Sequence, residues 1–114
     1  MTIARAIEGF EAHLKANGCS IHTIRSYLHD LGLLAKWLRR TRGPDEVKRI
    51  RPYHLDRFLT SQDALFTSKG HPRGPGALGR MRAVLRSFFR WLESCSLRKS
   101  TLPIALSLLQ GLLL

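Results

Sequence analysis

Acidic residues, cysteines and the motifs of familiar enzyme sites are scarce in this sequence. Its 114 residues contain 8 Asp and Glu against 19 Lys and Arg, and two cysteines. The motifs G-x-x-x-x-G-K-[ST], G-x-G-x-x-G and G-x-S-x-G do not occur, so phosphate-loop, dinucleotide-binding and esterase functions have no support. Cys19 and Cys95 belong to no C-x-x-C or Cys/His pattern, which argues against a disulfide framework or a zinc site.

Metal-binding and acid–base patterns are also missing. His22 and His29 lie seven residues apart, and neither has a histidine or carboxylate three or four residues away in a ligand pattern. Glu8 and Glu11 belong to the outer face of a predicted helix, where solvation is the ordinary state of a carboxylate. We therefore expect no metal and no cofactor, and these residues do not support an acid–base catalytic site.

Signals for export and membrane insertion are lacking. The first 14 residues have no apolar stretch of signal-peptide length, and they include two glutamates. The segment 104–114 is apolar but falls short of the about 20 residues that a membrane-spanning helix needs. A reduced cytoplasmic location without a membrane partner is the expectation.

Positive charge is what the sequence has in excess. The formal net charge is +11 and the isoelectric point is about 11.1. Such a balance predicts a polyanionic partner, with nucleic acid first and an anionic membrane second. A basic surface that serves only solubility is the alternative, which the gathering of basic residues on helix faces disfavours.

Hydrophobic periodicity predicts four helices, over residues 2–16, 20–40, 52–63 and 75–95. Asn17-Gly18 supplies a stop for the first helix, and Ser20 is a candidate N-cap for the second. No run alternates apolar and polar residues with β-branched enrichment, so no strand is predicted. The expected fold is an all-α, compact four-helix bundle, with a short C-terminal helical tail as an optional addition.

The predicted helix 75–95 has one apolar face and one arginine face. At about 100° per residue, the apolar arc holds Leu78, Met81, Val84, Leu85, Phe88, Phe89, Trp91, Leu92 and Cys95. The opposite arc holds Arg80, Arg82, Arg86 and Arg90, and no acidic residue occurs between positions 70 and 92. Four arginines without i, i+4 partners predict a helix that lies against something negative.

The predicted helix 20–40 also has a basic outer face, and one aromatic residue stands outside its apolar arc. Trp37 projects away from that arc, which leaves a packing contact with another helix and a functional contact as equal alternatives. In the loop 67–76, Lys69, His71 and Arg73 could reach a phosphate backbone, although an ordinary solvated loop explains them equally well.

Three segments of the chain resemble the N-terminal core-binding, SAM-like domain of the tyrosine recombinase or phage integrase family. They are FEAHLKANGCSIHTIRSYLHDLGLLAKWL, IRPYHLDRFL and MRAVLRSFFRWLES, in the order in which the family has its motifs. The resemblance covers roughly residues 3–103, which makes 1–103 the expected DNA-binding domain and 104–114 an apolar tail, linker or truncated end.

The resemblance implies binding of duplex DNA at a recombination half-site, with the second and fourth helices near the major groove. The residues expected at the DNA are Ser20, Thr23, Arg25, Ser26, Lys36, Arg40, Arg80, Arg82, Arg86 and Arg90. Arg82 and Arg86 are assigned to the groove, Arg80 and Arg90 to phosphates, and Thr23 to a phosphate or a helix cap. Gly74-Pro75-Gly76 departs from the family, which usually has Ser or Thr before this helix.

The resemblance further implies that strand exchange belongs to a separate C-terminal catalytic domain of the parent protein. That domain carries an arginine, a lysine, a His-x-x-Arg and a nucleophilic tyrosine, and Tyr27 and Tyr53 occupy the wrong positions for that tyrosine. The chain is expected to bind DNA in the bacterial nucleoid without cutting it, and a homo-oligomer on DNA is compatible with this role. The alternative is a helical protein-interaction module that uses the apolar tail and Trp37.

Overall fold

The computed structural model describes residues 1–95, and it contains five α-helices and one short 3₁₀ helix in that range. They are α1 (Ile3–Ala16), α2 (Ile21–Arg40), η1 (Val47–Arg49), α3 (Pro52–Leu59), α4 (Gln62–Leu65) and α5 (Pro75–Cys95). The predicted all-α fold is confirmed. The predicted apolar tail 104–114 lies outside the described residues.

Helices α1 and α2 form an antiparallel hairpin whose ends the sequence had marked. Thr2 Oγ1 accepts a hydrogen bond from the Arg5 amide (3.2 Å), and Ser20 Oγ accepts one from the Thr23 amide (3.1 Å). Each hydroxyl satisfies one of the free amides at a helix start. Gly18 has φ +73°, a left-handed conformation that ends α1 and that side chains other than glycine rarely adopt. The predicted stop and the predicted N-cap are both confirmed.

The segment predicted as one helix over 52–63 is divided into α3 and α4. The hydroxyl of Ser61 donates to the Phe58 carbonyl (2.6 Å) and accepts from the Ala64 amide (3.4 Å). A serine side chain that bonds to its own backbone in this way ends one helix and caps the next. The prediction of a single third helix, and of four helices in all, was wrong for this reason.

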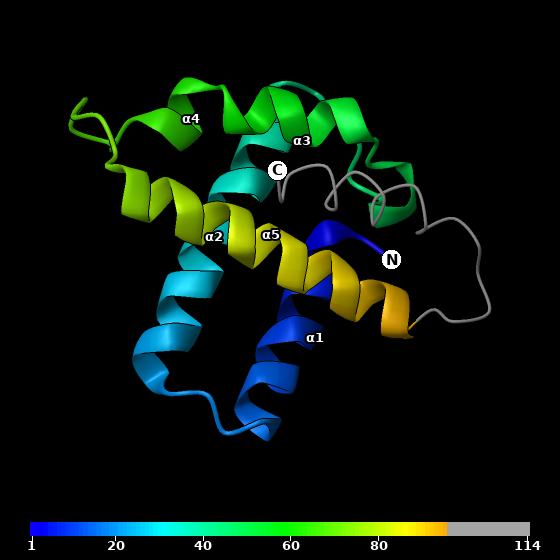
Figure 1. The fold of residues 1–114 in the computed structure, drawn as a ribbon. Helices are drawn as coiled ribbons and strands as arrows, with labels where there is room; N and C mark the ends of the chain where they lie inside the picture. The colour runs from blue at the N-terminus through cyan, green and yellow to red at the C-terminus, as the bar shows by residue number, and fades with distance from the viewer. Residues whose placement is uncertain (96–114) are drawn as a thin grey trace.

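Helix α5 lies across the α1–α2 hairpin, while α3 and α4 cover the C-terminal half of α2 (Figure 1). The apolar face predicted for α5 is the part of the helix that enters the core, and its six fully buried members are Met81, Val84, Leu85, Phe88, Phe89 and Leu92. The ring of Phe88 meets that of Phe10 edge to face, with centroids 5.4 Å apart. The core therefore joins all the long helices around α5.

Trp37 is a core residue. Its side chain is 6% exposed, and its ring lies 5.7 Å from that of Phe58 on α3. Because α3 packs on a second side of α2, the buried part of α2 is wider than the apolar arc read from the sequence. The functional contact considered for Trp37 was wrong, and the protein-interaction alternative loses one of its two supports.

Gly9 allows α1 and α5 to approach closely. A Cβ at this position would lie 2.9 Å from Cη2 of Trp91, whose ring packs against Phe10 at 5.5 Å. We expect Gly9→Ala to give no gain in the free energy of unfolding, although alanine favours a helix over glycine by roughly 1 kcal/mol. Gly32→Ala is the matched control, since a Cβ there meets nothing within 4 Å, and it should show that gain in urea denaturation. Equal stabilisation by both changes would contradict the close approach.

His54 makes the stability of α3 depend on pH. The Arg51 amide donates to Nδ1 of His54 (2.7 Å), and partial burial, together with the nearby Arg57 and Arg51 charges, lowers the pKa of His54 below 6.5. The unfolded chain therefore binds the proton more readily than the folded chain. The contribution of neutral His54 to the free energy of unfolding is complete above pH 6.5 and is lost as the pH falls below that value. We expect the free energy of unfolding in urea to differ less between pH 7.5 and pH 5 in His54→Gln than in the parent. Glutamine keeps a hydrogen-bond acceptor at this position. An unchanged difference would exclude His54 as the titrating group.

Candidate nucleic-acid interface

The outer side of α2 carries a row of polar and basic side chains in contact with solvent. His22, Arg25, His29 and Lys36 are exposed and recur every three, four or seven residues, so they lie on one side of the helix. We call these four residues the α2 basic row. At the start of the helix, Ser20 Oγ donates to Thr23 Oγ1 (3.0 Å), and Thr23 and Ser26 are half-buried.

The outer side of α5 carries three arginines at i, i+4 and i+8. Arg82 and Arg90 are exposed and Arg86 is half-buried. Among the described residues, none of the three has a carboxylate within 4.0 Å. We call Arg82, Arg86 and Arg90 the α5 arginine row. Its cationic groups keep their hydrogen-bond donors available for an external anion.

Arg80 is bound within the protein. Its Nε and Nη2 donate to the two carboxylate oxygens of Asp30 at 3.1 and 3.2 Å, in the two-pronged geometry typical of arginine and carboxylate. Asp30 is fully buried on α2, whereas the Arg80 side chain is 42% exposed. The hydrogen bond to Asp30 raises the pKa of Arg80. The expectation that all four arginines of this helix lack an acidic partner was wrong for Arg80.

Asp30 is the residue that sequence reasoning missed. It lies on the α5-facing side of α2, and no basic residue occurs three or four positions away to satisfy it within the helix. A carboxylate among buried residues is rare unless it is paired, so its position was the available signal. The pair joins the two helices that carry the basic rows, and it sets where they meet.

Arg40 is also engaged. Its guanidinium forms an ion pair with the carboxylate of Asp63 on α4, and it remains 56% exposed. The pair joins the C-terminal end of α2 to α4. The charge of Arg40, which the sequence suggested as a free DNA-binding cation, is thus partly neutralised by Asp63.

Few carboxylates lie on the two helices that carry the basic rows. The one acidic residue on α2 is the buried Asp30, and the one on α5 is Glu93 in its last turn. Glu11 pairs with Lys15 on α1 at 3.1 Å, and Glu46 pairs with the N-terminal amine. Asp63 of α4 is paired with Arg40. The five arginine and lysine side chains of the two rows therefore outnumber the two carboxylates on α2 and α5.

The model of one protein family, the N-terminal SAM-like domain of phage integrase, matches residues 7–95. The chain belongs to this family. The match begins in α1 and ends with α5, so it spans the helices that carry both rows. No curated protein and no solved structure gives a significant match.

The described part of this integrase SAM-like domain contains no group of three or more His, Cys, Asp and Glu residues that could hold a metal ion. None of its described helices is both long and apolar enough to cross a membrane. Cys19 is half-buried and Cys95 is exposed, and both are free thiols. Within residues 1–95, the α5 arginine row is the feature that most clearly suits an anionic ligand.

Proposed function

We propose that this domain binds duplex DNA as the core-binding part of a site-specific tyrosine recombinase, with α2 and α5 at the major groove. The α5 arginine row is the observation that carries the proposal. Its three guanidinium groups project from one side of a 21-residue helix, and no carboxylate of the described residues neutralises them. Such a row favours a ligand with regularly repeated negative charges, as in a nucleic-acid backbone.

The dimensions and chemistry of the two helices suit this ligand. An α-helix with its side chains is about 10–12 Å across, which matches a major groove about 12 Å wide. Arginine donates two parallel hydrogen bonds to guanine or to phosphate. We assign Arg82 and Arg86 to the groove and Arg90, Arg25 and Lys36 to phosphates.

The start of α2 supplies polar groups of a different kind. Ser20 caps the helix, and amides of its first turn point outward with the positive end of the helix dipole. Thr23 and Ser26 follow within the next two turns. These groups favour a phosphate contact that adds to those of the arginines and lysine.

The proposal assigns binding, and no strand cleavage, to this domain. In tyrosine recombinases, the chemistry belongs to a separate catalytic domain, which we propose as the partner of this domain in the parent protein. The Tyr27 ring packs against that of Phe10 with centroids 6.3 Å apart, and Tyr53 lies against His54 at 4.1 Å. The Tyr53 ring also lies 5.9 Å from Cζ of Arg57. Both tyrosines belong to the SAM-like domain, whereas the nucleophilic tyrosine of the family belongs to the catalytic domain.

Fluorescence anisotropy with a labelled 30-base-pair duplex tests the function. Six contacts that neutralise phosphate charge, from the five basic side chains assigned above and the start of α2, predict a slope of about −5 for log K against log salt, and a loss of about 10³ in affinity between 50 and 200 mM salt. The test compares the parent domain with a variant in which Arg82, Arg86 and Arg90 are all glutamine. Absent binding, or binding insensitive to salt, would contradict the proposal.

A further inference from the structure

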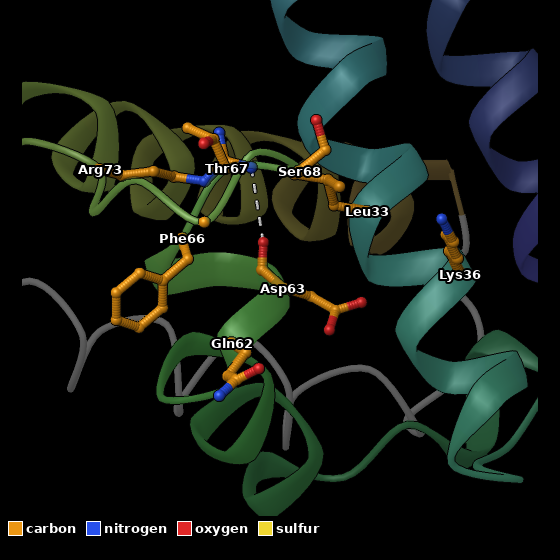
Figure 2. A pocket seen from close by; sticks show the side chains of 9 residues that line it. Leu33, Lys36, Gln62, Asp63, Phe66, Thr67, Ser68 and Arg73 are labelled. Atoms are coloured by element: carbon orange, nitrogen blue, oxygen red, sulfur yellow. Dashed lines mark hydrogen bonds between the residues drawn. The ribbon is translucent and has the colours of Figure 1, made fainter.

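A pocket of about 490 Å³ opens where α2, α4 and the loop before α5 meet (Figure 2). Lys36 of α2 and Arg73 of the loop stand on either side of Asp63. Thr67 and Ser68 add hydroxyl groups to the lining, and Gln62 adds an amide. The segments that form this pocket come from distant parts of the sequence. Its position continues the α2 basic row toward the C-terminal end of the helix.

Backbone hydrogen bonds hold the loop in one conformation. The Thr67 amide donates to the His71 carbonyl (2.8 Å), and the Gly70 amide donates to the Thr67 carbonyl (2.9 Å) in a turn where Gly70 has φ +82°. The Arg73 amide donates to the Leu65 carbonyl at 2.8 Å. A site on such a loop loses little conformational entropy when a ligand binds.

The charges around the pocket leave an excess of positive charge. Asp63 is already paired with Arg40, so its carboxylate is neutralised from within the protein. Lys36 has no carboxylate within 4.0 Å in the part of the chain described. Arg73 donates from Nη2 to the Asp63 carbonyl at 3.5 Å, while its Nε is buried with no hydrogen-bond partner among the described residues. Lys36 and Arg73 therefore remain to attract an anion.

We propose that this pocket binds one phosphate of the DNA backbone, through Lys36, Arg73 and the hydroxyls of Thr67 and Ser68. Lys36 follows Arg25 by eleven residues on α2, which corresponds to about 16 Å along a helix axis. This distance exceeds the about 12 Å width of the major groove. When Arg25 contacts a phosphate at one border of the groove, Lys36 can therefore contact a phosphate of the strand at the opposite border.

The hydroxyl groups fit this ligand. Thr67 Oγ1 accepts from the His71 amide (3.2 Å), so its hydrogen is free to point toward the pocket. Phosphate oxygens accept such bonds together with those from ammonium and guanidinium groups. The inference rests on the proposed DNA-binding function. It adds Arg73, Thr67 and Ser68, which lie outside the two basic rows, as partners of Lys36 at one phosphate.

Lys36→Gln tests the phosphate contact that both proposals share, and Thr67→Val tests the hydroxyl of the pocket alone, which should weaken binding less. Lys36 is exposed, so its replacement leaves the core intact. In duplex anisotropy measurements, we expect the salt slope to fall by about 0.9 and the affinity at 0.1 M salt to fall about eightfold, as for the loss of one phosphate contact. Lys48→Gln is the matched control, since Lys48 is exposed on η1 outside the pocket, and it should keep the parent slope. Arg73→Lys, which keeps the charge but loses the planar fork, should show an intermediate affinity.

A second measurement separates the two proposals. Titration of the domain with inorganic phosphate should shift the amide NMR signals of Thr67 and Ser68, and Lys36→Gln should abolish the shifts. DNA binding by Lys36→Gln equal to that of the parent would overturn the proposed phosphate site in the pocket. It would leave the proposed role of the α5 arginine row unchanged. If the phosphate shifts persist in that case, the pocket is a site for free anions. Failure of the parent domain to bind duplex DNA would overturn both proposals.

Discussion

Replacing Arg82 and Arg86 together with alanine is expected to weaken duplex binding about sixty-fold at 0.1 M salt. An arginine in the groove also neutralises phosphate charge at the groove edge, and each neutralised charge that is lost removes about 0.9 from the salt slope, so the slope should fall by about 1.8. The two residues lie one helical turn apart on the outer side of α5. Since Arg82 is exposed and Arg86 is half-buried, the change removes charge with little loss of core packing.

The control for this variant removes the same charge elsewhere. Arg5 on α1 and Arg49 on η1 are both exposed and lie outside the two basic rows. Arg5→Ala with Arg49→Ala should leave the slope near that of the parent, and circular dichroism should show that both double variants are folded. If the Arg82, Arg86 variant bound DNA as well as the parent with the same slope, α5 would not be the contact surface.

Replacing Arg80 with methionine is expected to lower the free energy of unfolding by about 3 kcal/mol. The change leaves the fully buried carboxylate of Asp30 without its partner, and an unpaired buried charge costs several kcal/mol. Asp30→Leu should cost less, because Arg80 is 42% exposed and water can solvate its guanidinium when the carboxylate is gone. Urea denaturation of both single variants measures this asymmetry.

The double variant Asp30→Leu with Arg80→Met completes the comparison. A buried ion pair replaced by apolar side chains of similar size often leaves stability unchanged. We therefore expect the double variant to be more stable than Arg80→Met alone, with strongly non-additive effects. Additive losses would mean that the two side chains contribute independently and do not act as a pair between α2 and α5.

Local sequence signals predicted the helices that present the basic rows. The bounds of α5, its buried face and the stop at Gly18 follow from periodicity and from the conformational freedom of glycine. The N-cap at Ser20 follows from the side chain alone. These features depend on residues within one or two turns of each other, which is the range over which sequence patterns act.

Two of the features that sequence did not predict depend on contacts between distant segments, and a third arises from hydrogen bonds between residues three positions apart. Arg80 was expected at a phosphate, yet its guanidinium meets Asp30, which lies 50 residues earlier. Trp37 is buried because α3 returns to cover a second side of α2. The division at Ser61 arises from one hydroxyl that bonds in both directions. Periodicity carries no information on any of these partners.

In the candidate site too, local sequence patterns predicted some features and missed those that depend on distant contacts. The arginines of α5 were visible as an unbalanced row, and Arg82, Arg86 and Arg90 remain so in the structure. The pocket between Lys36 and Arg73 was not visible, because it exists only where the loop before α5 folds against α2. That each of these residues contacts DNA stays a prediction.

An NMR titration of the domain with a 30-base-pair duplex tests the central claim most directly. The account predicts that the largest amide and arginine side-chain shifts occur at the start and outer side of α2 and along Arg82, Arg86 and Arg90 of α5. The outer face of α1, with Glu8 and Glu11, should remain unperturbed. Shifts concentrated on α1 or α3, or no shifts at all, would contradict a DNA interface formed by α2 and α5.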